Sequence, residues 1–254
     1  MNTVMIKKVI IVGHDNYGTR EIFTTVVDAH PDIEFQLIIT TGLYYKKRTF
    51  ESIFKMLREA SFVFCFYRFV EMVKDRIKGD TLYSRAKARK VPVYFTKDIN
   101  GVSAHGFIKK FAPNIIVSTF TMHIFKQSTI NLSSVATIGC HPSILPNYRG
   151  LEVFFWTLAN GEISSGVSVF HLTEKIDEGK VIMQEKFNIA PDETVESIYV
   201  KLTRISSRLM VSTIEKFKRG EEFKNIPCSG KGCYFPMPTR EAYKKFKAAG
   251  RKWR

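Results

Sequence analysis

Short apolar runs recur along the first half of the chain, and segments with apolar residues at helical spacing separate them. The runs predict strands at residues 7–13, 35–39, 91–95 and 114–118. Intervening segments, among them 21–29 and 103–111, predict helices. Strands that alternate with helices indicate an α/β fold with a Rossmann-like, doubly wound and mostly parallel sheet.

A second group of elements begins at Ala136, where a short apolar run ends in a loop because Pro142 and Pro146 prevent further strand pairing. The predicted elements after this loop are a helix at 151–159, a strand pair at 166–172 and 181–189, and a long helix that ends before Gly220. We expect one catalytic domain over residues 1–225 and a short basic extension over 226–254, whose end is a closing helix at 239–254.

A helical insertion is predicted at about residues 50–90. Its apolar run from Ala60 to Tyr67 is too short to span a bilayer, and Arg68 and Glu71 interrupt the continuation. A core or dimer-facing helix is the first interpretation, and a helix on a membrane surface is the second.

Lys and Arg exceed Asp and Glu by 39 to 24, which gives a net charge of +15. This charge favours anionic partners or is simply a basic surface. Four cysteines show no zinc-type spacing, so we expect no metal. The chain opens on a charged pair and a core strand instead of a leader, so we expect a cytoplasmic protein.

The segment from Gly13 to Arg20 joins the first strand to the first helix. Backbone N–H groups at such a helix start can hold a phosphate, so a phosphorylated acceptor is one interpretation and a plain turn is the other. Gly13 and Gly18 do not complete a dinucleotide-binding fingerprint, so nicotinamide binding is not expected.

His141 lies where a strand ends, and Asp177 follows the predicted strand at 166–172. In open α/β sheets, ligands bind in the crevice outside the carboxyl ends of the strands. Gly179 permits a tight turn directly after Asp177. We therefore expect His141 and Asp177 to face each other across one cleft.

The run from His141 to Gly150 reads His-Pro-Ser-Ile-Leu-Pro-Asn-Tyr-Arg-Gly, and Trp156, Asn160-Gly161, Gly166-Val167 and Asp177-Glu-Gly179 follow it. This set of motifs resembles the amino-terminal domain of formyltransferases that use 10-formyltetrahydrofolate. Glycinamide ribonucleotide, methionyl-tRNA and amino-sugar formyltransferases are members of that family. The resemblance is strongest over about residues 113–190.

The resemblance implies a formyltransferase that uses 10-formyltetrahydrofolate as cosubstrate and formylates a primary amine. It implies that His141 and Asp177 are catalytic. The implied folate-binding residues are Met122, His123, Ile124, Phe125, Thr173, Glu174, Lys175 and Ile176. For His123, a loop histidine without a ligand remains an alternative. The implied acceptor is a small amine, with a nucleotide-linked amino sugar as one candidate.

One position departs from the family pattern. The family motif is Asn-x-His, whereas this chain has Gly139-Cys140-His141, so Gly139 stands where the catalytic Asn is expected. A water or substrate group in the vacated space, or the hydroxyl of Thr137, could replace the amide. The alternatives to an active enzyme of this kind are a catalytically impaired folate-binding homologue and a tRNA-directed formyltransferase, and a homodimer is possible.

Overall fold

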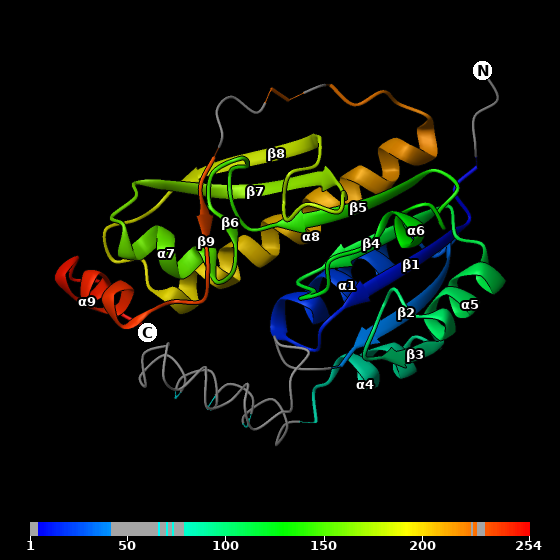
Figure 1. Cartoon of the computed structure of the whole chain (residues 1–254), viewed down its shortest axis with the longest axis horizontal. Helices are drawn as coiled ribbons and strands as arrows, with labels where there is room; N and C mark the ends of the chain where they lie inside the picture. Colours follow the sequence, from blue (N-terminus) through cyan, green and yellow to red (C-terminus); the bar gives the residue numbers. More distant parts are fainter. Residues whose placement is uncertain are drawn as a thin grey trace.

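The computed structural model describes residues 5–41, 66, 70, 73, 79–224, 226–227 and 232–254. Within these residues, one seven-stranded sheet has the order β3-β2-β1-β4-β5-β7-β8 (Figure 1). Its strands are β1 (Lys8–Gly13), β2 (Glu34–Thr40), β3 (Val93–Thr96), β4 (Ile115–Thr119), β5 (Ala136–His141), β7 (Ser164–His171) and β8 (Val181–Asn188). Strands β1 to β5 are parallel, while β7 is antiparallel to both β5 and β8. The predicted α/β fold with a mostly parallel sheet is confirmed.

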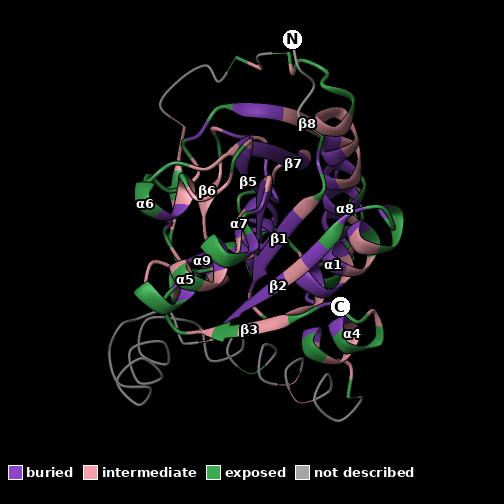
Figure 2. Ribbon diagram, turned by 90° about the vertical axis from the view of Figure 1, so that its right-hand side faces the viewer, coloured by how far each residue is buried: buried purple, intermediate pink, exposed green. Residues whose placement is uncertain are grey.

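Helices cover both faces of this sheet. They are α1 (Tyr17–Ala29), α4 (Leu82–Ala88), α5 (Val102–Phe111), α6 (Gln127–Ile130), α7 (Val153–Ala159), α8 (Val195–Arg219) and α9 (Arg240–Ala248). Alternate residues of β1 pack on opposite faces of the sheet, because successive side chains of a strand point to opposite sides. Val9 and Ile11 pack in the cluster with α1 and α8, while Ile10 and Val12 pack in the cluster with α5. Figure 2 shows these central strands as buried.

The helices begin and end at residues that satisfy free backbone groups. Asn16 caps α1 by accepting a hydrogen bond from the N–H of Thr19 at 2.9 Å, so this helix begins four residues before its predicted start. Thr194 opens α8 with a capping box, and Gly220 ends it in the left-handed conformation. The end of α8 agrees with the stop expected before Gly220.

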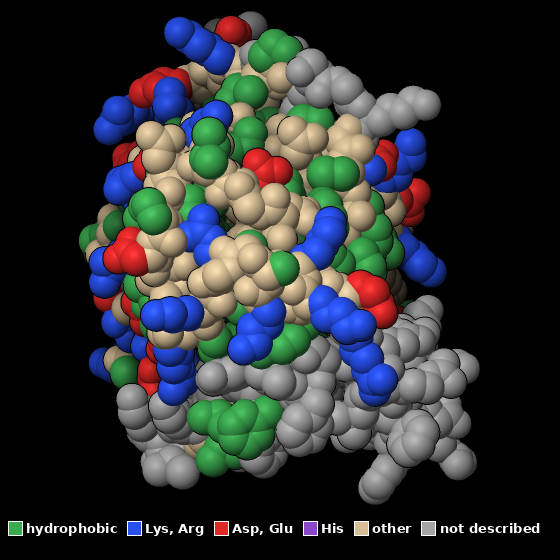
Figure 3. All heavy atoms as spheres, turned by 90° about the vertical axis from the view of Figure 1, so that its left-hand side faces the viewer, with side chains coloured by type: hydrophobic (Ala, Val, Ile, Leu, Met, Phe, Trp, Pro, Cys, Tyr) green, Lys and Arg blue, Asp and Glu red, His purple; other side chains and the backbone are tan. Residues whose placement is uncertain are grey.

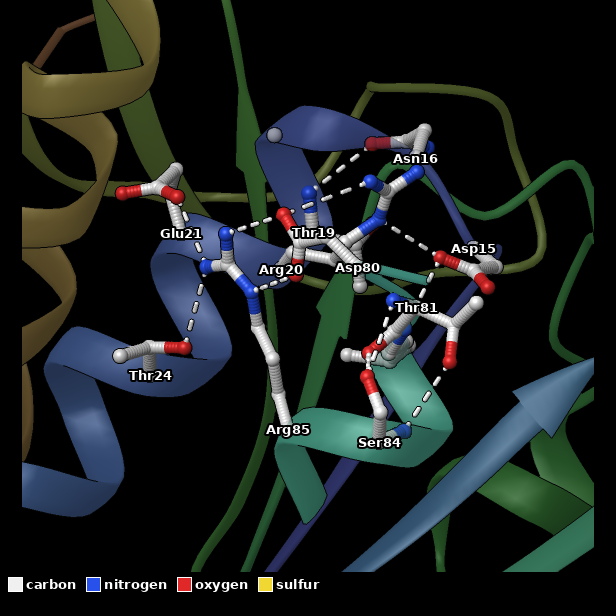
Figure 4. A network of polar contacts seen from close by, with 12 residues as sticks. Asp15, Asn16, Thr19, Arg20, Glu21, Thr24, Asp80, Thr81, Ser84 and Arg85 are labelled. Atoms are coloured by element: carbon white, nitrogen blue, oxygen red, sulfur yellow. Dashed lines mark hydrogen bonds and ion pairs between the residues drawn. The ribbon is translucent and has the colours of Figure 1, made fainter. Parts of the chain in front are cut away.

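An ion-pair network joins the start of α1 to α4 (Figure 4). The guanidinium of Arg20, which is buried, pairs with Asp15 at 2.8 Å. Arg85 of α4 donates to both Asp80 and Glu21. Because buried charges require partners, this network fixes the turn between β1 and α1 against the helix that precedes β3.

The last described segment returns to the body of the domain. Within it, β9 (Tyr234–Phe235) pairs in parallel with β6 (Arg149–Gly150) to form a two-stranded sheet. Helix α9 packs against α7, and its residue Phe246 stacks on Phe155 at 4.9 Å. The closing helix predicted at 239–254 is thus α9, which ends at Ala248 and buries Ala242 and Phe246.

The expectations for the insertion at 50–90 fall mostly outside the described residues, and α4 is the part that the structure describes as an element. Across the described ranges, no helix is both long enough and apolar enough to cross a membrane.

Candidate active site

His141 is the last residue of β5, and its side chain is buried at the end of the strand. Its Nε2 lies 2.7 Å from the carbonyl oxygen of Tyr148. A carbonyl only accepts hydrogen bonds, so Nε2 carries the hydrogen and donates it. Nδ1 is therefore the ring nitrogen at which His141 can gain or lose a proton.

Asp177 faces this nitrogen, with its Oδ2 3.6 Å from Nδ1 of His141. The backbone N–H of Gly150 donates a hydrogen bond to the same Oδ2 at 2.9 Å. The expected opposition of His141 and Asp177 is confirmed. The sequence analysis placed both residues at the carboxyl ends of strands along one edge of the sheet. That reason was wrong, because β7 is antiparallel to β5 and ends beside the start of that strand. Asp177 reaches His141 because the loop between β7 and β8 folds back along β5.

A pocket of about 220 Å³ opens beside this pair. It is lined from one loop by Met122, His123, Ile124 and Phe125, from another by Thr173, Lys175, Ile176 and Asp177, and from β5 by Gly139 and His141. Glu174 is not among the lining residues, because its carboxylate accepts the backbone N–H of Gln127 at the start of α6. The structure thus gathers the other sequence-predicted residues around one cavity.

The loop after β4 offers both apolar and polar groups to this cavity. Met122 and Ile124 are 38% and 52% exposed, whereas Phe125 is buried beneath them. Burial lowers the pKa of His123, the charge of Asp98 opposes this shift, and the charge of His14 adds to it. His123 is therefore a neutral ring near physiological pH.

The space expected beside Gly139 is not vacant. A Cβ built at this position would lie 2.6 Å from Cδ1 of Leu172 and 3.1 Å from two ring atoms of Phe170. Both side chains come from the end of β7 and the residue after it, which lie beside β5 as its antiparallel neighbour, with Phe170 the direct partner of Gly139. Leu172 thus lies where a side chain at position 139 would begin, while Gly139 itself lines the pocket, and replacement of the amide by a water or substrate group stays a prediction.

The hydroxyl of Thr137 does not replace the amide either. It donates to the carbonyl of Ile130 at 2.9 Å and lies 2.9 Å from the hydroxyl of Ser133. These contacts direct Thr137 toward the end of α6, away from the residues that line the pocket.

Tyr199 of α8 is a pocket residue that sequence reasoning missed. Its ring stacks on Phe154 at 4.9 Å, and its hydroxyl accepts the backbone N–H of Gly18 at 3.0 Å. With Thr19 capped by Asn16, the amides at the start of α1 are already bonded within the protein. This arrangement favours the plain-turn interpretation over a phosphate site. No local motif marks Tyr199, which is 181 residues from Gly18.

The C-terminal segment contacts the loop at residues 148–151. This loop supplies the Tyr148 carbonyl that bonds to His141 and the Gly150 N–H that bonds to Asp177. The backbone N–H of Tyr148 donates to Sγ of Cys233 at 3.2 Å, and that of Leu151 donates to the carbonyl of Phe235 at 2.9 Å. The rings of Tyr148 and Phe235 stack at 4.7 Å. The sequence alone gave no sign that this segment takes part in the site.

No group of three or more His, Cys, Asp or Glu side chains within the described ranges is arranged to hold a metal ion. Cys140 and Cys233 are free thiols, and burial raises the pKa of Cys140 to about 12. Cys65 and Cys228 lie outside the described residues.

The protein is thus an α/β protein with a mixed, mostly parallel sheet, and a His–Asp pair lies beside a cavity at the ends of its strands. Residues 97–214 match the family model described as "Formyl transferase". This segment belongs to the formyl transferase family, and the chain is similar in sequence to methionyl-tRNA formyltransferases and in fold to solved glycinamide ribonucleotide and sugar N-formyltransferases.

Two curated relatives illustrate the sequence similarity. The bifunctional polymyxin resistance protein ArnA of Wigglesworthia glossinidia brevipalpis is 29% identical over 155 residues, which are 61% of this chain and 24% of that protein. The methionyl-tRNA formyltransferase of Thermotoga sp. (strain RQ2) is 28% identical over 156 residues, which are 61% of this chain and 50% of that protein. The chain thus spans half or less of the length of these relatives.

Two solved structures share the fold. A sugar N-formyltransferase from Shewanella sp FDAARGOS_354 superposes with a TM-score of 0.62 at 15% identity, covering 96% of this chain and 87% of that one. An N-formyltransferase from Helicobacter canadensis, in complex with folinic acid and dTDP-3-aminofucose, superposes with a TM-score of 0.60 at 18% identity, covering 94% and 72%.

Proposed function

We propose that this protein is an N-formyltransferase that moves the formyl group of 10-formyltetrahydrofolate to the primary amine of a small acceptor. The observation that carries the proposal is the His141–Asp177 pair, with Nδ1 and Oδ2 3.6 Å apart, at the edge of the pocket. The family match over residues 97–214 supports the same chemistry.

Formyl transfer requires one bond to form and one to break. The lone pair of the acceptor nitrogen attacks the formyl carbon, and the π electrons of the C=O bond move onto its oxygen. The bond from this carbon to N10 then breaks and leaves its electron pair on N10. N10 takes up a proton while the acceptor nitrogen loses one, so the products are an N-formyl amine and tetrahydrofolate.

His141 and Asp177 suit the charge and proton movements of this reaction. The Tyr148 carbonyl holds the Nε2–H of His141, so Nδ1 faces Asp177 and can take or give the proton. A carboxylate next to the ring stabilises its cationic form, which in turn stabilises the negative oxygen. Gly150 keeps the carboxylate in place through its N–H bond to Oδ2.

The pocket residues suit a folate. Phe120, Ile124 and Phe125 offer apolar surface, and the segments around them offer backbone polar groups, which together fit a flat heteroaromatic ring. The related enzyme from Helicobacter canadensis is in complex with folinic acid and a nucleotide-linked amino sugar, which supports the same substrate classes here. We propose an amino sugar carried on a nucleotide as acceptor, with the Phe154 and Tyr199 rings as one wall of its site.

A second candidate function is a folate-binding homologue with impaired catalysis. The specific observation in its favour is the filled space at Gly139, where Leu172 and Phe170 replace the catalytic amide. Loss of one oxyanion donor reduces a rate by about 10²–10³-fold, so this difference weakens an enzyme without abolishing its chemistry.

Two measurements test the proposal. Calorimetry with a stable 10-formyltetrahydrofolate analogue is expected to show binding to the wild type. Folate-product absorbance with a panel of amino-sugar nucleotides is expected to show transfer by the wild type and a loss of at least about 100-fold in His141→Ala. His105→Ala is the matched control, because His105 bonds to Thr129 and does not line the pocket.

Each result has a clear meaning. Equal rates for wild type and His141→Ala, above background, contradict the assignment of the site. Binding without transfer supports the impaired homologue, and absence of binding contradicts both candidates.

The tRNA-directed alternative depends on the basic surface. On the side that carries α7 and α9, Lys and Arg side chains are interspersed with Asp, Glu and apolar side chains (Figure 3). Salt-dependent binding of tRNA by the protein would favour that alternative. The cytoplasmic location and the homodimer stay predictions.

A further inference from the structure

The proposed reaction places negative charge on the formyl oxygen, and the residue that usually shares in holding this charge is missing. Gly139 has no side chain, and Leu172 occupies the space in front of it. The hydroxyl of Thr137 is bonded to Ile130. The neighbouring strand β4 is the next place to look for a donor to this oxygen.

Ser118 of β4 is the direct neighbour of Gly139. The two residues are partners in the parallel ladder between β4 and β5. Partner residues point to the same face, and so do residues two apart on one strand, so Ser118 lies on the face that carries Gly139 and His141. On its other side Ser118 pairs with Val12, which packs in the cluster that contacts Leu172.

The Ser118 side chain has a place in the pocket and no hydrogen-bond partner among the described residues. It is 7% exposed and lines the cavity together with Gly139 and His141. No hydrogen bond joins its hydroxyl to any residue that the structure describes, whereas Thr119, the next residue, donates to the carbonyl of Val12 at 3.4 Å. Ser118 Oγ is not among the enclosed side-chain atoms that lack a partner in the described residues, so it is open to the cavity and can donate its hydrogen to a group bound there.

We propose that Ser118 Oγ donates a hydrogen bond to the formyl oxygen of the folate donor and takes over the part of the missing amide. Neighbouring strands lie about 4.8 Å apart, so a side chain on β4 can reach the oxygen that a side chain on β5 would otherwise contact. The proton stays on Ser118 throughout, because the hydroxyl stabilises the charge without transferring a proton. This inference rests on the proposed formyl transfer.

The test compares Ser118→Ala with Ser206→Ala. The control deletes a buried hydroxyl of α8, which packs on the opposite face of the sheet. Ser118→Ala is expected to lower kcat for formyl transfer by about 100-fold, the effect of losing one oxyanion donor, with the Kd of a folate analogue unchanged. Ser206→Ala is expected to leave both values within twofold of the wild type.

Infrared spectroscopy gives a readout that does not require activity. A stable 10-formyl folate analogue with a ¹³C-labelled formyl carbonyl is bound to each protein, and the carbonyl stretch is expected at lower frequency in the wild type than in Ser118→Ala. If Ser118→Ala has the same carbonyl frequency as the wild type, or a kcat within twofold of it, the role of Ser118 is overturned while the proposed function stands. If the wild type does not bind the analogue, the proposed function fails and this inference fails with it.

Discussion

Gly139→Asn restores the residue of the family motif, but its side chain would press on Leu172 and Phe170, which must shift to admit it. The new Cβ would lie 2.6 Å from Cδ1 of Leu172 and 3.1 Å from two atoms of the Phe170 ring. Overpacking of this kind lowers the free energy of unfolding by about 1–3 kcal/mol. A loss of 1 kcal/mol lowers Tm by about 2–4 °C in a domain of this size, so we expect a fall of about 2–12 °C.

Leu172→Ala in the same chain tests whether this contact is the reason. Removing the Leu172 side chain takes away the atom nearest to the new Cβ. Residues in direct contact show coupling free energies of about 0.5–3 kcal/mol. The loss of unfolding free energy in the double variant is therefore expected to be smaller than the sum of the losses in the two single variants. With the space open, the amide can reach the formyl oxygen, and we expect transfer at least about 10-fold faster than in Leu172→Ala alone.

The experiment measures Tm by differential scanning fluorimetry and formyl transfer by folate-product absorbance. It uses four proteins: wild type, each single variant and the double variant. The packing argument is wrong if Gly139→Asn has the same Tm as the wild type and if adding Leu172→Ala to it changes neither stability nor transfer rate. Leu172 would then not fill the amide position.

Two further predictions concern stability. Gly150→Ala presses a Cβ against the carbonyl of Phe235 at a φ of +104°, so it should lower unfolding free energy by about 3 kcal/mol, measured by urea titration. Gly106→Ala on α5, where an added Cβ meets nothing within 4 Å, should instead raise it by about 0.5–1 kcal/mol, and equal effects would contradict the assigned strain. Burial lowers the pKa values of His30, His123 and His171, so the unfolded chain binds protons that the folded chain does not, and stability should fall as pH drops below about 6.5. A constant midpoint in urea between pH 7.5 and pH 5 would contradict this.

The sequence predicted the elements whose pattern is local. The apolar runs of β1, β4 and β5 are buried on both faces, so each appears as a continuous hydrophobic segment. The β3 strand begins at Val93, two residues later than predicted. Pro92 lies just before it and cannot donate a hydrogen bond to a strand partner.

The parts of the site that depend on distant contacts could not be predicted. Leu172 is one apolar residue among many in the sequence, and only the antiparallel pairing of β7 with β5 brings it to Gly139. Strand β9 is two residues long, which is too short for any period to be recognised. Ser118 ends an otherwise apolar run, and its importance depends on the register between β4 and β5.

The pairing of β6 with β9 has a consequence for synthesis on the ribosome. Tyr148 and Cys233, which are bonded across this pair, are 85 residues apart. A chain emerges from its N-terminus, and β5 with its histidine is complete long before residue 235 is made. The carbonyl of Tyr148 and the amide of Gly150 are thus fixed only after most of the chain has left the ribosome. A nascent protein therefore carries β1 to β5 before Tyr148 and Gly150 are held beside His141 and Asp177, so the candidate site is among the last parts of the fold to be completed.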